Sequence, residues 1–133
     1  MAYKLNILED SNIIVATLYG DVDMTVDKKA IAVDVDKIIS KAGNTPHWRI
    51  FDYTQYHLTF SDMTFGLAFE SSNAPGNSAD PRVLPVFVGT DDLIRQKSEA
   101  SQQAQYGALN IPVFDTAAEA IDHCRAAIPL PRD

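Results

Sequence analysis

A near-continuous apolar run at residues 83–88, Val-Leu-Pro-Val-Phe-Val, constrains the fold more than any other segment. A strand this apolar has to be covered on both faces, as the strands of a parallel sheet are. Apolar residues with helical spacing follow it, and a second short apolar run occupies residues 111–114. A strand, a helix and a strand in this order predict a parallel pair joined by a right-handed crossover.

The amino-terminal half begins with a hairpin and then continues the same alternation. Residues 3–9 and 13–19 are β-rich runs on either side of Asp-Ser-Asn, a turn sequence that predicts antiparallel pairing. Apolar residues at spacings of three and four then predict a helix that ends at Gly43 and Asn44. The next strand is predicted at residues 48–53.

The second helix is the least regular of the predicted elements. We place its start at Ser61, whose hydroxyl can cap it. The apolar residues that follow alternate as in a strand, yet pairs of them are also four residues apart, as in a helix: Met63, Phe65, Leu67 and Phe69. Residues 71–82 are rich in Asn, Pro, Gly and Ser and predict a loop long enough to act as a lid.

Two further helices complete the predicted fold. Thr90 is the expected cap of a third helix that runs to about Tyr106, and Thr116 with Glu119 predicts a capping box at the start of the fourth. Residues 1–133 are therefore expected to form a single α/β domain. Its five-stranded mixed sheet has an antiparallel first strand, and four helices pack on it.

The charge balance bears on the class of partner. The chain carries 18 acidic and 11 basic residues, a formal net charge of −7, and the basic residues are scattered along the sequence. Nucleic acids and anionic membranes are bound through clustered Lys and Arg. Neither is therefore expected as a partner.

The sequence also bears on location. The amino-terminal residues lack the basic start and apolar stretch of a signal peptide, and no apolar run approaches the ~20 residues that cross a bilayer. With a single cysteine, Cys124, an intramolecular disulfide is excluded. These features predict a cytoplasmic protein without a membrane span.

Residue types that often carry catalysis do not form a known arrangement. The histidines, His47, His57 and His123, have no metal-binding spacing. Asp52, His57 and Ser61 are close in sequence, but the Gly-x-Ser-x-Gly elbow is missing, and a helix cap explains Ser61 better. We therefore expect no enzymatic activity, no cofactor and no metal site.

Two groups of residues remain as candidate binding positions. Aromatic rings concentrate around the second helix, which predicts an interaction surface formed by Tyr56, Phe60, Phe65 and Phe69. The alternative is that the loop that follows the second helix covers it, so that these rings are not exposed. The carboxyl ends of the parallel strands, where ligands bind in open α/β sheets, gather Asp52, Tyr53, Thr90 and Asp115. Capping and loop solvation are the favoured explanation of these four residues.

Four segments together carry a family resemblance: residues 18–23 (Leu-Tyr-Gly-Asp-Val-Asp), 48–52 (Trp-Arg-Ile-Phe-Asp), 82–92 and 111–121. With the order of elements, they resemble the STAS-like family of sulfate transporter and anti-sigma factor antagonist domains, in particular its small stand-alone branch. In the antagonists, a strand ending in Asp is followed by Asp-Ser-Ser-Gly, in which a partner kinase phosphorylates a serine. Here Asp52 matches the strand end, the Asp-Ser-Ser-Gly segment is absent, and Ser61 is the candidate phosphorylation site.

The resemblance implies a non-enzymatic regulatory module, acting in bacterial signalling through a protein partner or through self-association as a homodimer. The alternative is a protein that binds a small apolar ligand or lipid, in a pocket under the 71–82 loop lined by Phe60, Phe65 and Phe69.

Overall fold

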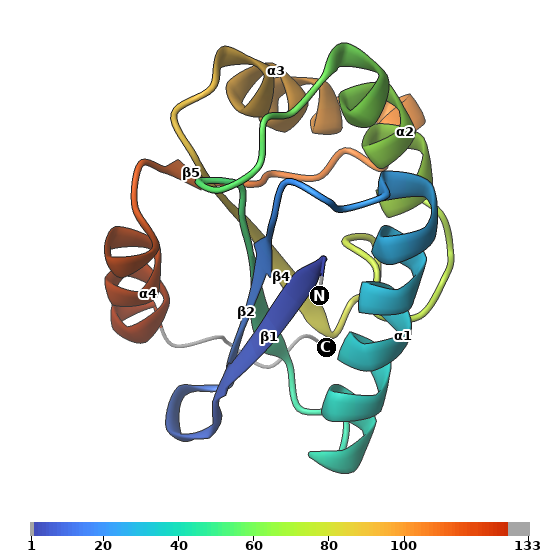
Figure 1. Ribbon diagram of the computed structural model, residues 1–133. Coiled ribbons are helices and arrows are strands. Elements are labelled where there is room, and N and C mark those ends of the chain that lie inside the picture. Colours follow the sequence, from blue (N-terminus) through green and yellow to red (C-terminus); the bar gives the residue numbers. More distant parts are fainter. Residues whose placement is uncertain (1, 128–133) are drawn as a thin grey trace.

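The computed structural model describes residues 2–127 and contains a five-stranded mixed sheet with helices on both faces (Figure 1). The strands lie side by side in chain order: β1 (Tyr3–Leu8), β2 (Ile13–Leu18), β3 (His47–Asp52), β4 (Val83–Val88) and β5 (Val113–Phe114). β1 is antiparallel to β2, and each later pair of neighbours is parallel. The predicted α/β class and sheet are confirmed.

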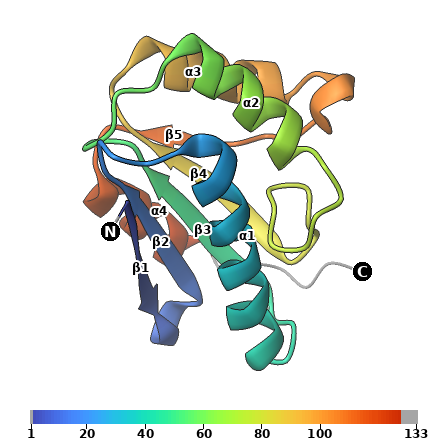
Figure 2. The same ribbon diagram turned by 45° about the vertical axis from the view of Figure 1, so that its right-hand side comes forward.

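Four α-helices are described, and they divide unequally between the two faces of the sheet (Figure 2). α1 (Met24–Lys41), α2 (Phe60–Glu70) and α3 (Asp92–Ser101) cover one face, and α4 (Ala117–Ala126) covers the other. The prediction that the third helix runs to Tyr106 is wrong, because α3 ends at Ser101 and a separate 3-10 turn follows at Ala104–Tyr106. The sequence Pro129-Leu130-Pro131 predicts the end of the last helix, and it lies outside the described residues.

Successive side chains of each strand point to opposite faces of the sheet, which divides the core into two layers. Ile14, Ala16 and Leu18 of β2 point toward α1, α2 and α3, together with Phe51 of β3 and Phe87 of β4. The residues between them point toward Ala120 and Cys124 of α4: Ile13, Val15, Ile50, Val86 and Val88. A strand with apolar residues on both faces is what the 83–88 run predicts. None of the described helices is long and apolar enough to span a bilayer.

Two predicted caps are displaced by one or two residues. Thr59, not Ser61, caps α2: its backbone is extended, its hydroxyl accepts from the Asp62 N–H, and the Asp62 carboxylate accepts from the Thr59 N–H. This capping box satisfies two backbone groups, which Ser61 inside the first turn cannot do. Asp91, not Thr90, caps α3, since its carboxylate accepts from the Leu93 N–H.

The 71–82 loop, predicted as long enough for a lid, is anchored to the helices beside it. The Asn77 side chain donates to the Phe69 carbonyl, and both Asn77 and Ser78 are buried. Gly76, at φ +83°, lies so close to α1 that a Cβ there would be 2.0 Å from the Ala32 carbonyl oxygen. Glycine is therefore needed at this contact both for its positive φ and for its lack of a side chain.

Candidate functional site

The most unusual feature of the structure is a group of charged side chains enclosed in the core. It is formed by residues from α1, β3 and the position directly after β3, α2, the 71–82 loop and α3, and we call it the charged cluster: Lys28, Arg49, Tyr53, Glu70, Ser78 and Lys97. Lys28, Arg49 and Lys97 are each only 1% exposed, and Glu70 is 4% exposed. Such residues are almost never fully buried unless they are paired. Here three basic groups surround one carboxylate.

Glu70 is the centre of the charged cluster. Lys28 Nζ donates to Glu70 Oε2 at 3.0 Å, and Lys97 Nζ donates to the same oxygen. Both also donate to Tyr53 Oη, at 2.8 and 3.0 Å respectively. On the other side, Arg49 Nη2 donates to Ser78 Oγ at 2.9 Å, and Ser78 Oγ donates to Glu70 Oε1 at 3.1 Å. The loop is thereby joined to the sheet.

Aromatic faces and a glycine complete the enclosure of the charged cluster. Lys28 Nζ lies 3.5 Å from the centroid of the Phe51 ring and the Arg49 guanidinium lies 3.7 Å from it, both within the range of cation–π attraction. On α2, a Cβ at Gly66 would lie 2.8 Å from Lys97 Nζ and 2.9 Å from Glu70 Oε2. The absence of a side chain at Gly66 is therefore what lets Lys97 reach Glu70.

Burial and the pairing of opposite charges have opposing effects on the pKa values of the charged side chains in the cluster. Burial lowers the pKa of Lys28 well below its ordinary value, and repulsion by Lys97 and Arg49 adds to this while Glu70 opposes it. For Lys97 burial acts in the same direction, but the attraction of Glu70 outweighs it and raises the pKa. Burial alone would raise the pKa of Glu70, but the three basic groups lower it below its ordinary value. Burial raises the pKa of Tyr53 to about 12.

The sequence interpretation missed this cluster. Along the sequence the basic residues are scattered, whereas folding brings Lys28, Arg49 and Lys97 together with their polar ends enclosed. A usable signal was present: Lys28 is spaced three before Ile31, Lys97 three after Ile94, and Glu70 three after Leu67. Each charge thus has the helical phase of a core residue.

Only two of the four residues predicted to form a ligand site at the carboxyl ends of the strands line a common groove. Tyr53 and Thr90 line one groove of about 390 Å³ at the carboxyl ends of β3 and β4, which we call the carboxyl-end groove; its other lining residues are Thr54, Gln55, Tyr56, His57, Asp91 and Ile94. Asp52 does not line this groove: its carboxylate accepts from the Thr54 N–H and hydroxyl. Asp115 is exposed beside Arg95 at 3.7 Å. The phenol of Tyr53 points inward to the charged cluster.

The four predicted surface rings differ in exposure. Phe60, at the start of α2, is 67% exposed. Tyr56 is half-buried, and its hydroxyl donates to Asp62 at 2.6 Å. Phe65 and Phe69 are half-buried and stack on each other with ring centroids 5.8 Å apart. Phe60 is therefore the ring that α2 presents to solvent.

Other sequence candidates occupy ordinary structural positions. Ser61 is exposed in the first turn of α2, and Cys124 is buried on the inner face of α4, where burial raises the pKa of its thiol to about 12. His57 lies 3.5 Å from Asp91, and the His123 ring packs against Trp48 and Phe114. Within residues 2–127, no group of three His, Cys, Asp or Glu residues is placed to hold a metal ion.

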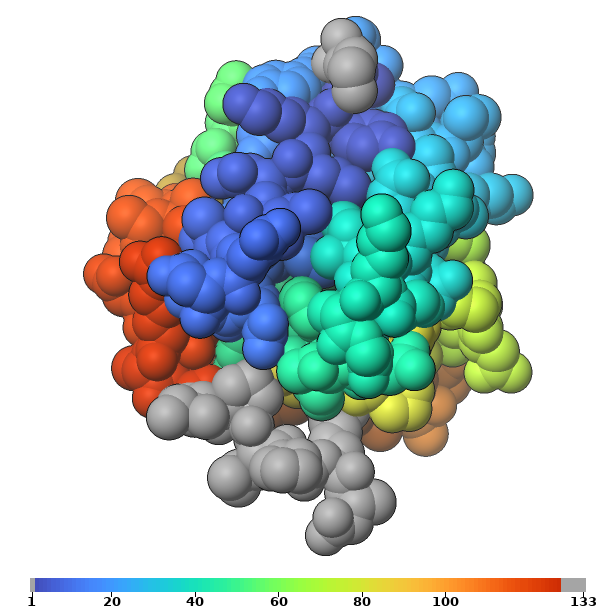
Figure 3. All heavy atoms as spheres, turned by 90° about the horizontal axis from the view of Figure 1, so that it is seen from below, coloured from blue at the N-terminus to red at the C-terminus, as the bar shows by residue number. Residues whose placement is uncertain are grey.

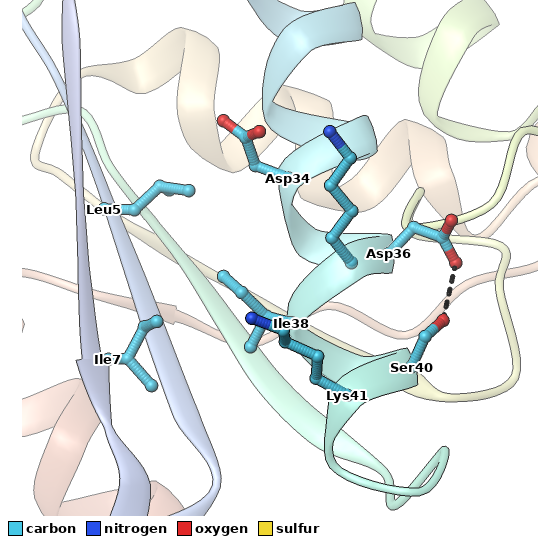
Figure 4. A pocket seen from close by; sticks show the side chains of 8 residues that line it. Leu5, Ile7, Asp34, Asp36, Ile38, Ser40 and Lys41 are labelled. Atoms are coloured by element: carbon cyan, nitrogen blue, oxygen red, sulfur yellow. Dashed lines mark hydrogen bonds between the residues drawn. The ribbon is translucent and has the colours of Figure 1, made fainter.

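A larger groove lies on the opposite side of the molecule, between β1 and α1 (Figure 3). It has a volume of about 760 Å³, and we call it the β1–α1 groove. Figure 4 shows its apolar floor, where Leu5 and Ile7 of β1 point toward Ile38 of α1. Neither groove is lined by Phe65 or Phe69, so the pocket expected under the 71–82 loop stays a hypothesis.

Comparison of the sequence with protein families and with curated proteins identifies no relative. No protein-family model matches this sequence, and no curated protein sequence matches it.

Proposed function

We propose that the protein is a non-enzymatic, regulatory interaction module of the STAS-like type, and that it binds a protein partner at the amino-terminal end of α2. The observation that carries this proposal is the exposure of Phe60, a residue that is 67% exposed. Exposed aromatic residues on a rigid support are the side chains that most often dominate protein–protein affinity.

The support of Phe60 is rigid. Its neighbour Thr59 forms the capping box with Asp62, and Tyr56 bonds to the same Asp62 carboxylate. The start of α2 is thus fixed from both sides, so little conformational entropy is lost when Phe60 is covered by a partner.

The surroundings of Phe60 indicate the chemistry of the partner. Tyr56 connects the start of α2 to the carboxyl-end groove, which offers hydroxyl, amide and imidazole groups as a polar rim. Asp62 and Asp92 lie in the first turns of α2 and α3, and Asp91 caps α3. We therefore expect an apolar segment of the partner to cover Phe60, flanked by basic residues.

Ser61 follows Phe60 and is exposed beside it. Phosphorylation there, which the STAS-like resemblance implies, would act on this same surface and add negative charge beside Asp62.

The experiment is site-specific photocrosslinking in cells that naturally express the protein. The photoreactive p-benzoylphenylalanine replaces Phe60 in one variant and Val33, a 52% exposed residue on α1, in the matched control. The protein that crosslinks at position 60 is then purified and titrated against the wild type, Phe60→Ser and Val33→Ser.

We expect Phe60→Ser to weaken binding about tenfold or more, as loss of an aromatic anchor does, and Val33→Ser to leave affinity nearly unchanged. Equal crosslinking at both positions, or equal affinities of the two serine variants, contradicts the proposal.

A further inference from the structure

Within residues 2–127, the outer edge of β1 is free to pair with another strand. β1 is the first strand of the sheet, and no segment within residues 2–127 pairs with its far side. The Tyr19 N–H donates to the Ala2 carbonyl at 2.9 Å, so Ala2 directs its backbone groups toward β2. Because this direction alternates along an antiparallel strand, Tyr3, Leu5 and Ile7 direct their backbone groups outward.

The same three residues also direct their side chains toward α1. Leu5 and Ile7 form the floor of the β1–α1 groove with Ile38 (Figure 4). The Tyr3 hydroxyl donates to Asp34 at 2.9 Å. Ile7 remains 39% exposed. A second groove of about 490 Å³ shares Ile7 and Ile38 and extends the apolar surface toward the 3-10 turn at Glu9–Ser11. The outer edge of β1 thus presents outward-directed backbone groups and apolar side chains at the same place.

This edge has little protection against strand pairing on the side of the β1–α1 groove. Isolated proteins commonly block an edge strand with proline, a bulge or charged side chains, lysine above all. β1 reads Tyr-Lys-Leu-Asn-Ile-Leu: it contains no proline, and the charge of Lys4 lies on the face away from the groove. An unblocked apolar edge is what a pairing interface requires.

We propose that two copies of the chain associate through β1, antiparallel and with the two-fold axis at Leu5. In this register Leu5 pairs with Leu5 of the second copy and Tyr3 pairs with its Ile7, so apolar residues meet apolar residues. The two five-stranded sheets join into one, and each copy covers the other's β1–α1 groove. The interface is isologous, as two-fold symmetry demands.

Charge complementarity favours a second copy over an unrelated strand. The groove is lined by two acidic residues, Asp34 and Asp36, and two basic ones, Lys37 and Lys41, so its formal charge is zero in a chain of net charge −7. Asp36 already pairs with Arg82 at 2.7 Å. A two-fold axis sets the α1 helices antiparallel, which brings Asp34 of one copy toward Lys41 of the other.

The test is sedimentation velocity of the purified full chain over a concentration series. The 14.6 kDa chain is expected to shift to a species of twice that mass. Ile7→Lys should raise the dimer dissociation constant about tenfold or more, because it places a charge in the joined groove. The matched control Val33→Lys should change it little, since Val33 is an exposed aliphatic residue outside the groove.

Two further variants test the register. Asp34→Lys should weaken the dimer through repulsion by Lys41 of the other copy, and adding Lys41→Asp should restore it. Leu5→Cys, on the axis, should form an intermolecular disulfide faster than Ile7→Cys. A chain that stays monomeric throughout, or a dimer that Ile7→Lys and Val33→Lys weaken equally, overturns the proposal. A dimer that the charge swap fails to restore overturns the register.

Discussion

Lys28 Nζ lies 3.0 Å from Glu70 Oε2 in the core of the protein, and the two residues are 42 positions apart in the chain. Lys97 reaches the same oxygen from a third helix. One carboxylate thus connects α1, α2 and α3, and stability should depend on it more than on any single apolar contact between these helices.

Replacement of Glu70 by glutamine should be strongly destabilising. The variant keeps the shape of the side chain but leaves Lys97 and Arg49 buried without a counter-charge, and breaking a buried pair in this way costs about 3–5 kcal/mol. Urea unfolding followed by circular dichroism measures the loss. Glu99→Gln on the exposed face of α3 is the control and should change the free energy of unfolding by less than about 0.5 kcal/mol. Similar losses in the two variants would contradict the central role of Glu70.

Replacement of Lys28 by methionine, unlike that of Glu70 by glutamine, should not destabilise the protein. Methionine fills a similar volume without the desolvation of an amine, and Lys97 and Arg49 still pair with Glu70, so the variant should be about as stable as the wild type. A loss of stability as large as that of Glu70→Gln would show that Lys28 contributes as a charged partner.

The pH dependence of stability provides a separate test of Lys28. Between its lowered pKa in the folded protein and its ordinary value of 10.5, Lys28 binds a proton in the unfolded chain but not in the folded one. Its contribution to the free energy of unfolding therefore rises with pH across this window. The raised pKa values of Lys97 and Tyr53 act oppositely, but only above 10.5 and above 10.0. Urea titrations at pH values approaching 10.0, below the range in which Lys97 and Tyr53 contribute, should thus show a positive slope that is smaller in Lys28→Met.

Gly66→Ala should reverse the usual effect of this substitution in a helix. Alanine in place of a helical glycine normally stabilises by about 1 kcal/mol. Here the added Cβ would meet Lys97 Nζ and Glu70 Oε2 at less than 3.0 Å, and such overpacking costs about 1–3 kcal/mol. Thermal unfolding should show a lower midpoint. A raised midpoint would show that Lys97 and Glu70 can separate without loss.

The cap of α2 is tested by a pair of alanine variants. Thr59→Ala removes the hydroxyl that accepts from the Asp62 N–H and should cost about 1 kcal/mol of unfolding free energy. Ser61→Ala removes an exposed hydroxyl inside the first turn and should cost less than about 0.5 kcal/mol. A greater loss in Ser61→Ala would reinstate the cap that the sequence predicts.

Elements with a strong local signal were predicted from the sequence within a residue or two. The apolar run at Val83–Val88 is β4. Thr116 caps α4 as predicted, because its hydroxyl accepts from the Glu119 N–H; the Glu119 carboxylate accepts from this hydroxyl, so only one half of the predicted capping box is formed. These features are recognisable because the residues that make them are neighbours in the chain.

The charged cluster could not be predicted with the same ease, because its members come from five separate segments. Each charge looks isolated in its own element, and only the packing of α1, α2 and α3 on β3 brings Lys28, Glu70 and Lys97 together. The exposure of Phe60 depends in the same way on tertiary packing: the sequence indicates an excess of rings, but not which of them the sheet covers.

The order of the strands in the sheet repeats their order along the chain. During synthesis each strand therefore leaves the ribosome after the neighbour with which it pairs, and the sheet can grow at a single edge. The last charged residue of the core to emerge is Lys97, well before β5 and α4. We expect the nascent domain to become resistant to protease when α3 has emerged, rather than when the chain is complete.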